Sequence, residues 1–366
     1  EFFRNAAYGE LWIGRRQTLE EKSTEMGITT ADLADLDRAL AALAPATTRV
    51  LRGYDARVDA AVLASGAAGN RAARDRELAS AISNMRLTKD SWEIAELRGA
   101  CEATVRGFED VARVLPADRP VSERLLDGVF GLRARHDGNG VGYSSIVGNG
   151  PHATILHWVR NDGVTQPGDL LLMDMGVESN SLYTADVTRT LPVSGQFTDL
   201  QRSVYDIVYA SQQAGIEALK PGVEFKEIHQ ICMRVLAEGL GDLGILPGSV
   251  EEALDRDAMF YRRWTLHGFG HMLGLDVHDC AHASNDKYRD GKVDAGYVLT
   301  VEPGLYFQVD DELVPAELRG LGIRIEDDIL VTENGAVNLS VGLPRTSSDV
   351  ESWLAAQRDA GPRLPE

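Results

Sequence analysis

The sequence has few cysteines, few aromatic residues and no long apolar run. Of its 366 residues, 3 are cysteine and 7% are aromatic. An odd number of widely separated cysteines fits neither a disulfide framework nor a Cys-x-x-Cys zinc site, so we expect a reducing compartment and predict a cytoplasmic protein. The apolar runs fall short of the roughly 20 residues that a membrane span requires. The sequence also lacks a segment with the charge and apolar pattern of a signal peptide.

Basic residues are also fewer than acidic ones. The chain has 37 Lys and Arg against 56 Asp and Glu, a formal net charge of -19. A chain this acidic is a poor partner for nucleic-acid phosphates or an anionic membrane, so we expect neither, whereas cationic ligands such as metal ions are compatible with it. Its 44% hydrophobic and 25% charged residues are typical of a folded protein with a sizeable core.

The length favours two domains. Residues 1–88 contain a helical pattern near 31–43 and no motif that carries chemistry, and we predict a partial N-terminal domain there. Asp90 is a plausible helix cap, and apolar residues follow it at helical spacing until Pro116, so we place a catalytic domain over 89–345. The remaining residues, 346–366, are polar and are predicted to be a C-terminal surface tail.

Helical and strand patterns are mixed in the second domain. Two further helices are predicted, one from about residue 200 to the stop at Pro221 and one over 225–236. Alternating or continuous apolar runs bounded by Gly, Asn and Pro predict strands, which are expected at 169–176, 182–191, 297–307 and 322–331. This mixed order, with adjacent strand pairs, predicts an α+β fold.

Acidic residues occupy unexpected places in the predicted strands. Asp174 ends the run Leu-Leu-Leu-Met, and Glu302 and Glu326 interrupt two other apolar runs. An ionised carboxylate removed from water costs several kcal/mol unless a counter-charge or a metal compensates it. An ion pair or a strand end would explain one such residue. Three of them, joined by Asp186 in a fourth position, indicate a metal site.

The spacing of Asp174 and Asp186 suggests how the two acids meet. If 178–181 is the turn of a hairpin, symmetric pairing about Asn180 places them directly opposite each other. Opposed Cβ atoms lie about 4.5–5.5 Å apart, where like charges repel unless a cation lies between them. A divalent metal would satisfy both. The alternatives are a hairpin with exposed acids, or one in which Arg189 neutralises an acid.

Histidines are clustered too. Six of the eight lie in two short stretches and are His152, His157, His267, His271, His278 and His282. Three glycines in the stretch 267–274 oppose a stable helix, so the spacing of four between the first two histidines of that stretch is not a helical metal-binding pair. We interpret the stretch as a strand or loop in which glycines allow a close backbone approach, and we expect one or two of these histidines to bind metal.

Several carboxylates with an imidazole form an oxygen-rich donor set. Such a set suits Mn²⁺, Co²⁺, Fe²⁺ or Zn²⁺ and exceeds the four ligands of a tetrahedral zinc. Two metals that share carboxylate bridges fit better. Paired metals about 3.5–4 Å apart hold a water that becomes a hydroxide nucleophile near neutral pH, so the implied chemistry is hydrolysis.

Taken together, these motifs resemble the pita-bread metallopeptidase family (M24B), and within it the aminopeptidase P and prolidase branch. The similarity extends in order and rough spacing over about Asp90 to Leu343. It is carried by Leu156-His157, Met173–Gly176, Asp186–Thr190, His267–His271, Asp276–Asp279, Thr300–Gly304 and Gly322–Asp328. It implies a pita-bread catalytic domain preceded by a smaller N-terminal domain. The interval from Asp174 to Asp186 is one residue longer than in many members of the family.

The resemblance also implies roles for individual residues. The expected ligands of a dinuclear centre are Asp174, Asp186, His271, Glu302 and Glu326, with Asp186 and Glu326 bridging. The expected substrate-binding and oxyanion-stabilising residues are His157, His267 and His278. Glu302 would also handle the proton of the bridging water, and Arg324 and Tyr143 would orient the carboxylates. The implied cofactor is a pair of divalent ions, for which we expect Mn²⁺, with Co²⁺, Zn²⁺ or Fe²⁺ as alternatives.

The activity implied by the resemblance is that of a metal-dependent Xaa-Pro aminopeptidase. Such an enzyme releases the N-terminal residue from peptides with proline in second position by a metal-bridged hydroxide, and homodimers or tetramers are usual in the family. The alternatives are a prolidase that cleaves Xaa-Pro dipeptides and a catalytically silent peptide-binding relative. Methionine aminopeptidase is disfavoured by the N-terminal region and by the histidine pattern. A nucleophilic Cys280 beside His278 and His282 is a further alternative.

Overall fold

A computed structural model describes residues 7, 9–43, 48–66, 72–255 and 257–365. Internal contacts divide the chain into two units, Glu1–Ala79 and Ser80–Glu366. This division falls before the domain boundary that we predicted at 88/89, which stays a prediction. Every residue predicted to belong to the functional site lies in the second unit.

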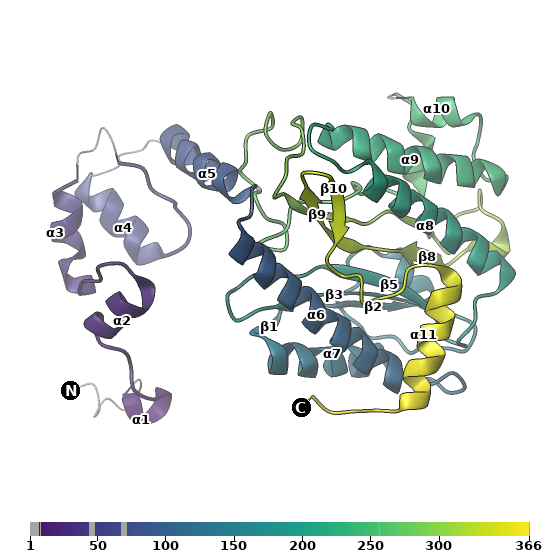
Figure 1. Cartoon of the computed structure of the whole chain (residues 1–366), viewed down its shortest axis with the longest axis horizontal. Coiled ribbons are helices and arrows are strands. Elements are labelled where there is room, and N and C mark those ends of the chain that lie inside the picture. The colour runs from purple at the N-terminus through teal and green to yellow at the C-terminus, as the bar shows by residue number, and fades with distance from the viewer. Residues whose placement is uncertain (1–6, 8, 44–47, 67–71, 256, 366) are drawn as a thin grey trace. The chain divides into compact units, whose positions relative to one another are not determined.

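The first unit is built from short helices (Figure 1). They are α1 (Glu10–Ile13), α2 (Leu19–Met26), the 3-10 turn Leu33–Asp35, α3 (Leu36–Ala41) and α4 (Ala56–Ser65), followed by α5 (Ala72–Arg86), which continues into the second unit. The predicted helical stretch near 31–43 corresponds to the 3-10 turn and α3. Leu40 and Val62 form the buried centre of a small apolar cluster.

Helices frame the second unit, and most of them are longer than those of the first. They are α6 (Ser91–Val114), α7 (Glu123–Asp137), α8 (Asp199–Ala218), α9 (Phe225–Asp242), α10 (Val250–Leu254) and α11 (Ser347–Ala360), with 3-10 turns at Gly150–Thr154, Phe260–Arg263 and Ala316–Leu318. The predicted cap of α6 is confirmed: the Asp90 side chain accepts hydrogen bonds from the amides of Trp92 and Glu93, and the Glu93 side chain accepts one from the Asp90 amide. Pro116 follows the end of this helix, where it cannot disturb the helical hydrogen bonds.

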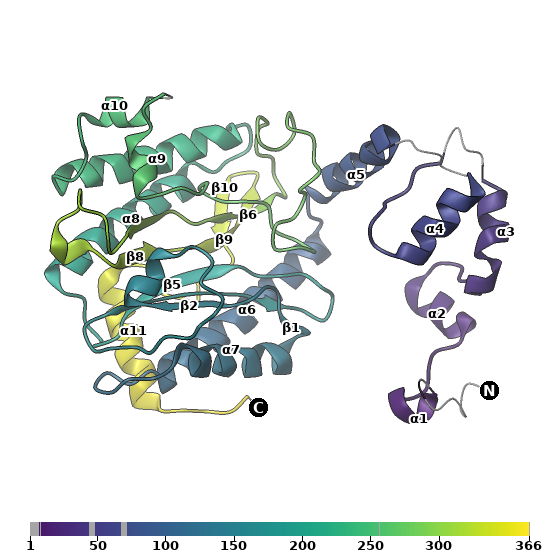
Figure 2. The same cartoon turned by 180° about the vertical axis from the view of Figure 1, so that it is seen from behind.

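The strands lie between these helices and pair antiparallel throughout. They are β1 (Gly140–Val141), β2 (Ile146–Asn149), β3 (Leu170–Met175), β4 (Val177–Glu178), β5 (Val187–Pro192), β6 (Val298–Val301), β7 (Gly304–Phe307), β8 (Leu321–Arg324), β9 (Asp327–Thr332) and β10 (Gly335–Asn338). The strand orders are β2-β3-β5, β10-β9-β6, β7-β8 and β1-β4. Figures 1 and 2 show α6 and α7 on one side of the strands and α8 and α9 on the other. The predicted α+β class is confirmed.

Two of the predicted strands are each divided in two by the structure. The expected strand at 297–307 becomes β6 and β7 with a break at Glu302 and Pro303, and the expected strand at 322–331 becomes β8 and β9 with a break at Ile325 and Glu326. Both breaks fall at the carboxylates that interrupted the apolar runs. The chain therefore leaves regular pairing where an acidic side chain enters the site.

The predicted register of the hairpin between β3 and β5 is wrong. Asp174 pairs with Thr188 rather than with Asp186. The hairpin is centred on residue 181, because the amide of Ser179 bonds to the carbonyl of Tyr183. Leu182 takes the left-handed conformation, with φ 73°, inside this three-residue loop. Glycine usually fills this loop position, so a leucine there could not be predicted from local sequence patterns.

The predicted C-terminal tail is also wrong, because residues 347–360 form α11. The side chain of Thr346 caps this helix by accepting a hydrogen bond from the amide of Asp349. Val350 and Leu354, four residues apart, are fully buried, and the Arg358 side chain donates to the carbonyl oxygens of Leu115 and Val193. A narrow apolar stripe in an otherwise polar segment thus packs against the core.

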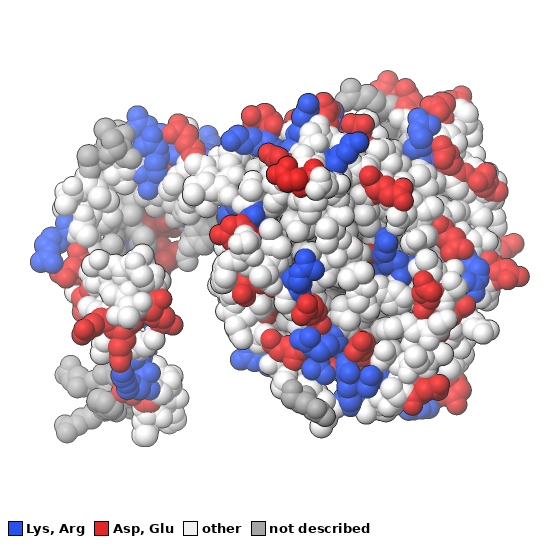
Figure 3. Space-filling model, in the orientation of Figure 1, with Lys and Arg blue, Asp and Glu red and all other residues white. Residues whose placement is uncertain are grey.

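The surface agrees with the composition. On the face of the molecule drawn in Figure 3, acidic and basic side chains are interspersed, and the basic ones do not gather into one patch. Among the residues that the structure describes, no helix is both long enough and apolar enough to cross a membrane.

Candidate metal centre

The predicted site residues surround one small cavity of about 70 Å³ in the second unit. It is lined by Leu156, His157, Asp174, Asp186, His267, His271, His278, Glu302, Arg324 and Glu326. Tyr143 joins the group through hydrogen bonds to two of these acids. The structure therefore brings together every residue that we predicted, from segments up to about 180 positions apart. The roles assigned to them stay predictions.

The four carboxylates lie at or next to the ends of strands. Asp174 lies near the end of β3 and Asp186 directly precedes β5. Glu302 directly follows β6, and Glu326 lies in the break before β9. The amide of Glu326 donates to the carbonyl of Thr188 at 3.1 Å, which joins the break before β9 to strand β5.

A glycine places the histidine of the cluster. An added Cβ on Gly270 would lie 1.9 Å from the carbonyl oxygen of Thr300, so only glycine fits there. This close approach sets His271 beside β6, where its amide donates to the Thr300 hydroxyl at 3.0 Å. The expectation that the glycines of this segment allow a close backbone approach holds at this position, where the contact is with a strand.

Asp174 and Asp186 approach each other although they are not paired across the hairpin. The Tyr143 hydroxyl oxygen lies 2.6 Å from Oδ1 of Asp174 and 2.5 Å from Oδ1 of Asp186. A hydroxyl has a single proton, so it can donate to only one of these oxygens at a time. This hydroxyl therefore satisfies only one of the two acids at a time.

Arg324 is the counter-charge inside the cluster. Its Nη2 lies 2.5 Å from Oδ2 of Asp174, and its Nε donates to the Thr188 hydroxyl at 3.1 Å. That hydroxyl in turn donates to Oε2 of Glu326 at 2.5 Å. The proposed alternative, in which Arg189 neutralises one of the hairpin acids, is wrong, because Arg189 pairs with Asp327 at 2.7 Å instead.

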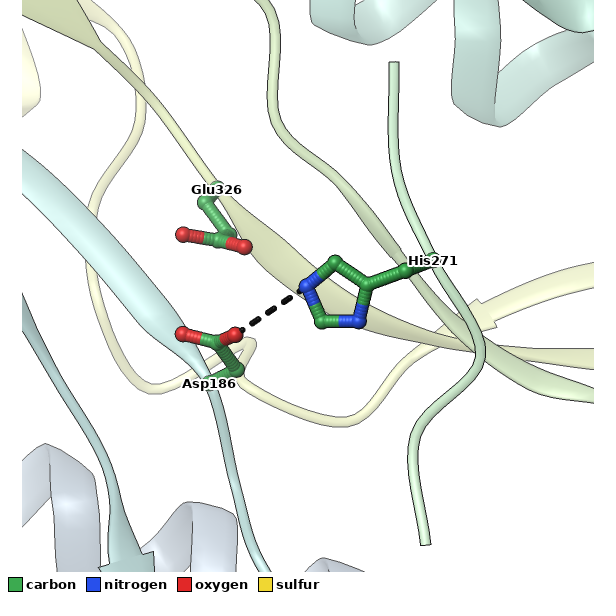
Figure 4. Close-up of side chains that lie close together, drawn as sticks. All are labelled: Asp186, His271 and Glu326. Atoms are coloured by element: carbon green, nitrogen blue, oxygen red, sulfur yellow. Dashed lines mark ion pairs between the residues drawn. The ribbon is translucent and has the colours of Figure 1, made fainter. Parts of the chain in front are cut away.

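Three side chains meet the geometric requirement for a shared metal ion. One ligand atom from each of Asp186, His271 and Glu326 lies within 4.8 Å of the other two, and Figure 4 shows the imidazole ring directed toward the carboxylates. The Nε2 atom of His271 is 3.3 Å from Oδ2 of Asp186 and 3.5 Å from Oε1 of Glu302. Its Nδ1 atom faces the Met272 carbonyl at 3.2 Å, which fixes the tautomer that leaves Nε2 free to bind a metal.

The protonation equilibria show how much negative charge is concentrated here. Burial raises the pKa of Asp174 to about 6 and that of Glu302 to about 7, and it raises the pKa of Glu326 well above its usual range. Burial alone would lower the pKa of His271, but the adjacent Asp186 and Glu302 raise it to about 9. Three of the four acids therefore bind protons more strongly than free carboxyl groups, whereas the His271 ring lowers the pKa of Asp186 against the effect of burial. One buried guanidinium does not balance the negative charge of the cluster. Divalent cations would supply the missing positive charge, so this donor set fits them.

The other histidines line the same cavity. Nδ1 of His267 donates to the Gly268 carbonyl at 2.8 Å, so in the neutral ring Nε2 accepts from the Tyr306 hydroxyl at 2.8 Å. Burial and the nearby Arg324 lower the pKa of His267 to about 3, so this ring is neutral. The exposed ring of His278 meets the ring of His271 edge to face, with the ring centroids 4.4 Å apart. His157 is exposed at the rim.

Several contributors to the site were not predicted. Thr188 and Thr300 donate hydrogen bonds to Glu326 and Glu302, and Tyr306 accepts one from Arg324. Asp328 accepts from the Asp186 amide at 3.1 Å and from the Cys101 thiol at 3.0 Å. Each threonine lies two residues from an acid, on the same face of the chain, and this spacing is the signal that was available. Threonine is so common in strands that the signal is weak.

The Cys280 alternative is not supported by the geometry. This residue does not line the metal cavity, and burial raises the pKa of its thiol to about 12. Because the thiolate is the reactive form, a thiol with such a pKa is a poor nucleophile at neutral pH.

The chain was compared with known proteins. The model of metallopeptidase family M24 matches residues 95–333. Xaa-Pro aminopeptidase 1 of Streptomyces coelicolor is 54% identical over 348 residues, which cover 95% of this chain and 70% of the relative. The Xaa-Pro aminopeptidase of Escherichia coli is 40% identical over 279 residues, which cover 76% of this chain and 61% of the relative.

Solved structures give the same result. Proline aminopeptidase P II from Yersinia pestis superimposes with a TM-score of 0.84 at 32% identity, covering 95% of this chain and 81% of the other. Zinc-substituted aminopeptidase P of Escherichia coli, in complex with product, superimposes with a TM-score of 0.85 at 33% identity, covering 95% and 80%.

Proposed function

Since this chain belongs to metallopeptidase family M24 and has its pita-bread fold, we propose that it is a metal-dependent Xaa-Pro aminopeptidase. Such an enzyme is a hydrolase that releases the N-terminal residue from peptides with proline in second position. The observation that carries the proposal is the cavity in which four carboxylates and His271 converge. The identity of 54% to a protein named Xaa-Pro aminopeptidase 1 supports the substrate class.

We propose that the cavity holds two divalent metal ions. The ligands would be Asp174, Asp186, His271, Glu302 and Glu326, with Asp186 and Glu326 as bridges. Manganese is the ion that we propose, with cobalt, zinc or iron as alternatives that the same oxygen-rich set accepts. When bound, such ions activate a water molecule for attack and polarise the carbonyl oxygen of the peptide.

Glu302 is the proposed proton carrier. Its Oε1 atom accepts from the Thr300 hydroxyl at 3.2 Å, while Oε2 faces the His267 ring at 3.4 Å. A carboxyl group in this position can take up a proton in one step and release it in the next. Oε2 would therefore hold the proton from the attacking water and pass it to the proline nitrogen, which becomes the new amine.

The histidines are proposed to bind the peptide. The free amino terminus would lie at the acidic end of the cavity, where carboxylates attract its positive charge. His157 and His278, both exposed, would contact the residues on either side of the cleaved bond, and His278 would stabilise the developing oxyanion. His267 would support His278 in this role, in the neutral form that Tyr306 holds by a hydrogen bond.

One side-by-side assay tests this proposal. Hydrolysis of an Xaa-Pro dipeptide and of an Xaa-Pro-Xaa tripeptide would be measured on chelated protein and after Mn²⁺, Co²⁺ or Zn²⁺ is restored. Metal-dependent release of the first residue from the tripeptide is the expected result. Cleavage of the dipeptide alone would instead assign the protein as a prolidase. If neither peptide is cleaved with any metal, the enzymatic proposal fails and a peptide-binding role is left.

The assembly and the location stay proposals as well. We propose a dimer or tetramer, which light scattering of the purified protein would test, and a cytoplasmic location. A monodisperse monomer at the concentration of the activity assay would contradict the first.

A further inference from the structure

We propose that Glu123 is a positioning residue that holds the segment 149–163, and with it His157, at the rim of the metal cavity. The part played by His157 rests on the proposed function, whereas the anchoring of the segment does not. Glu123 is the first residue of α7 and does not line the cavity. Its effect on the site would pass through the segment that it binds.

The carboxylate of Glu123 accepts four hydrogen bonds, and all four donors belong to this one segment. Oε1 accepts from the Asn149 amide at 2.8 Å and from Nδ1 of His152 at 2.9 Å. Oε2 accepts from Nε1 of Trp158 at 2.9 Å and from the Gly163 amide at 2.8 Å. The donors span both ends and the middle of the segment, so this one side chain joins its separate parts, while Gln308 and Asn161 add further contacts.

The carboxylate is enclosed by these donors. The side chain of Glu123 is 0% exposed, and its ion-pair partner in the described part of the chain is a histidine, His152, rather than a Lys or Arg. A buried carboxylate of this kind is tolerated only because hydrogen-bond donors satisfy its oxygens. Replacing one oxygen by a group that cannot accept would therefore release the segment rather than merely weaken a surface contact.

The main chain of Gly163 makes two hydrogen bonds with Glu123. The main-chain amide of Glu123 donates to the Gly163 carbonyl at 3.1 Å, while the Gly163 amide donates back to the side chain. An added Cβ at Gly163 would lie 2.6 Å from Oε1 of Glu123 and 2.6 Å from Nδ1 of His152. The segment and the glutamate fit together only without a side chain at this position.

The hydrogen bonds to Glu123 also constrain the position of His157. Its ring is exposed, and among the described residues no hydrogen bond or ion pair to its side chain holds it. The adjacent Trp158 is buried, and its indole is bonded to Glu123 and stacked on the His152 ring with the centroids 3.8 Å apart. The guanidinium of Arg160 lies 4.2 Å from the centroid of the Trp158 ring. One neighbour of His157, Trp158, is thus bonded to Glu123, and the other, Leu156, packs against the same apolar cluster as Trp158.

The first test replaces Glu123 by glutamine, which has the same shape but one acceptor oxygen. For Glu123→Gln we expect kcat/KM on the Xaa-Pro-Xaa tripeptide to fall about 10- to 100-fold, the cost of misplacing a group near the reaction by about an ångström. Bound metal per chain should stay unchanged, because none of the proposed ligands lies in 149–163. The matched control is Asp110→Asn, which alters a buried carboxylate that joins Arg133 of α7 to α6. This control should lower stability and leave kcat/KM within about twofold.

A double-mutant cycle separates positioning from general damage. If Glu123 acts through His157, then Glu123→Gln should cost less than about twofold in the His157→Ala background, because the group that it positions is already gone. An equal loss of kcat/KM in both backgrounds would overturn the inference. If Glu123→Gln does not fold, Trp158→Phe carries the same cycle, since it removes one donor to the carboxylate and keeps an aromatic ring.

Hydrogen exchange gives a readout that needs no activity. In Glu123→Gln, the amides of peptides from 149–163 should exchange at least about tenfold faster than in the wild type, and in Asp110→Asn they should not. Unchanged exchange in this segment would refute the anchoring, whether or not the wild-type protein cleaves peptides. Faster exchange with an inactive wild type would instead reject the proposed function and leave the anchoring in place.

Discussion

Removal of the metal ions is expected to make the stability of this protein fall as the pH rises. Burial raises the pKa of Glu302 from 4.5 to about 7, and that of Asp174 from 3.8 to about 6. Both acids therefore bind protons more tightly in the folded than in the unfolded chain. Their favourable contribution is fully present below the unfolded pKa, near 4, and is lost as the pH rises through the folded value. His271, with a pKa raised to about 9, acts in the same direction at higher pH.

The magnitude follows from these pKa values. At about 1.4 kcal/mol for each tenfold change in proton affinity, Glu302 alone accounts for about 3 kcal/mol of the free energy of unfolding between pH 4.5 and pH 8. Asp174 contributes about 2 kcal/mol over the same interval by the same conversion, although the two effects are not additive because the groups interact. Asp186 opposes them only at acid pH, since its pKa is lowered by the His271 ring against the effect of burial. The chelated protein should therefore lose several kcal/mol between pH 5 and pH 8.

Metal binding should reverse this trend. The ligands bind metal in their deprotonated forms, so metal affinity and the stabilisation that it brings both rise with pH. Urea denaturation would be followed by tryptophan fluorescence at pH 5 and pH 8, on chelated and on Mn²⁺-loaded protein. The loaded protein serves as the control for the net charge of -19, because both forms share this background. A second control, Glu302→Gln, should reduce the pH dependence of the chelated form.

A chelated protein as stable at pH 8 as at pH 5 would show that these carboxyl groups do not bind protons more tightly in the folded chain. A stability difference between loaded and chelated protein that did not grow over this range would show that metal binding does not compete with those protons.

Three further predictions follow from single contacts. Tyr143→Phe removes the hydroxyl that lies against both Asp174 and Asp186 and should weaken metal binding about 10- to 100-fold in a competition titration. An unchanged affinity would show that the hydroxyl does not order the ligands. Arg324→Ala leaves Asp174 buried without its counter-charge and should lower the free energy of unfolding of the chelated protein by about 3–5 kcal/mol, measured by urea denaturation. A change near zero would contradict the pairing of these two residues. Leu354→Ala should lower the free energy of unfolding by about 2–5 kcal/mol and leave kcat/KM unchanged, because Leu354 is fully buried. The exposed control Leu364→Ala should lower it by less than about 0.5 kcal/mol. Equal effects of the two substitutions would contradict the packing of α11.

The composition of the site could be predicted from the sequence because its residues break local rules. Carboxylates at Asp174, Glu302 and Glu326 within apolar runs have no structural reason to be there, and the glycines around His271 oppose a helix. Such violations stand out without knowledge of the fold. The structure adds that the two long predicted strands end at Glu302 and Glu326, so that each acid lies at a break.

The features that we did not predict either have ordinary sequence patterns or depend on contacts between distant segments. The register of the hairpin depends on the left-handed conformation of Leu182, which leucine seldom adopts. The helix α11 has only Val350 and Leu354 fully buried among polar residues, so its composition is that of a surface segment. Thr188 and Tyr306 are ordinary strand residues in sequence, and only the fold places their hydroxyls beside Glu326 and Arg324.

The most direct test of the account is a titration of the chelated protein with Mn²⁺, in which bound metal per chain and release of the first residue from an Xaa-Pro-Xaa tripeptide are measured on the same samples. The account predicts that activity is absent without metal and reaches its plateau as bound metal approaches two ions per chain, the number expected of a carboxylate-bridged pair. Full activity of the metal-free protein, or no cleavage at saturating metal, would contradict it.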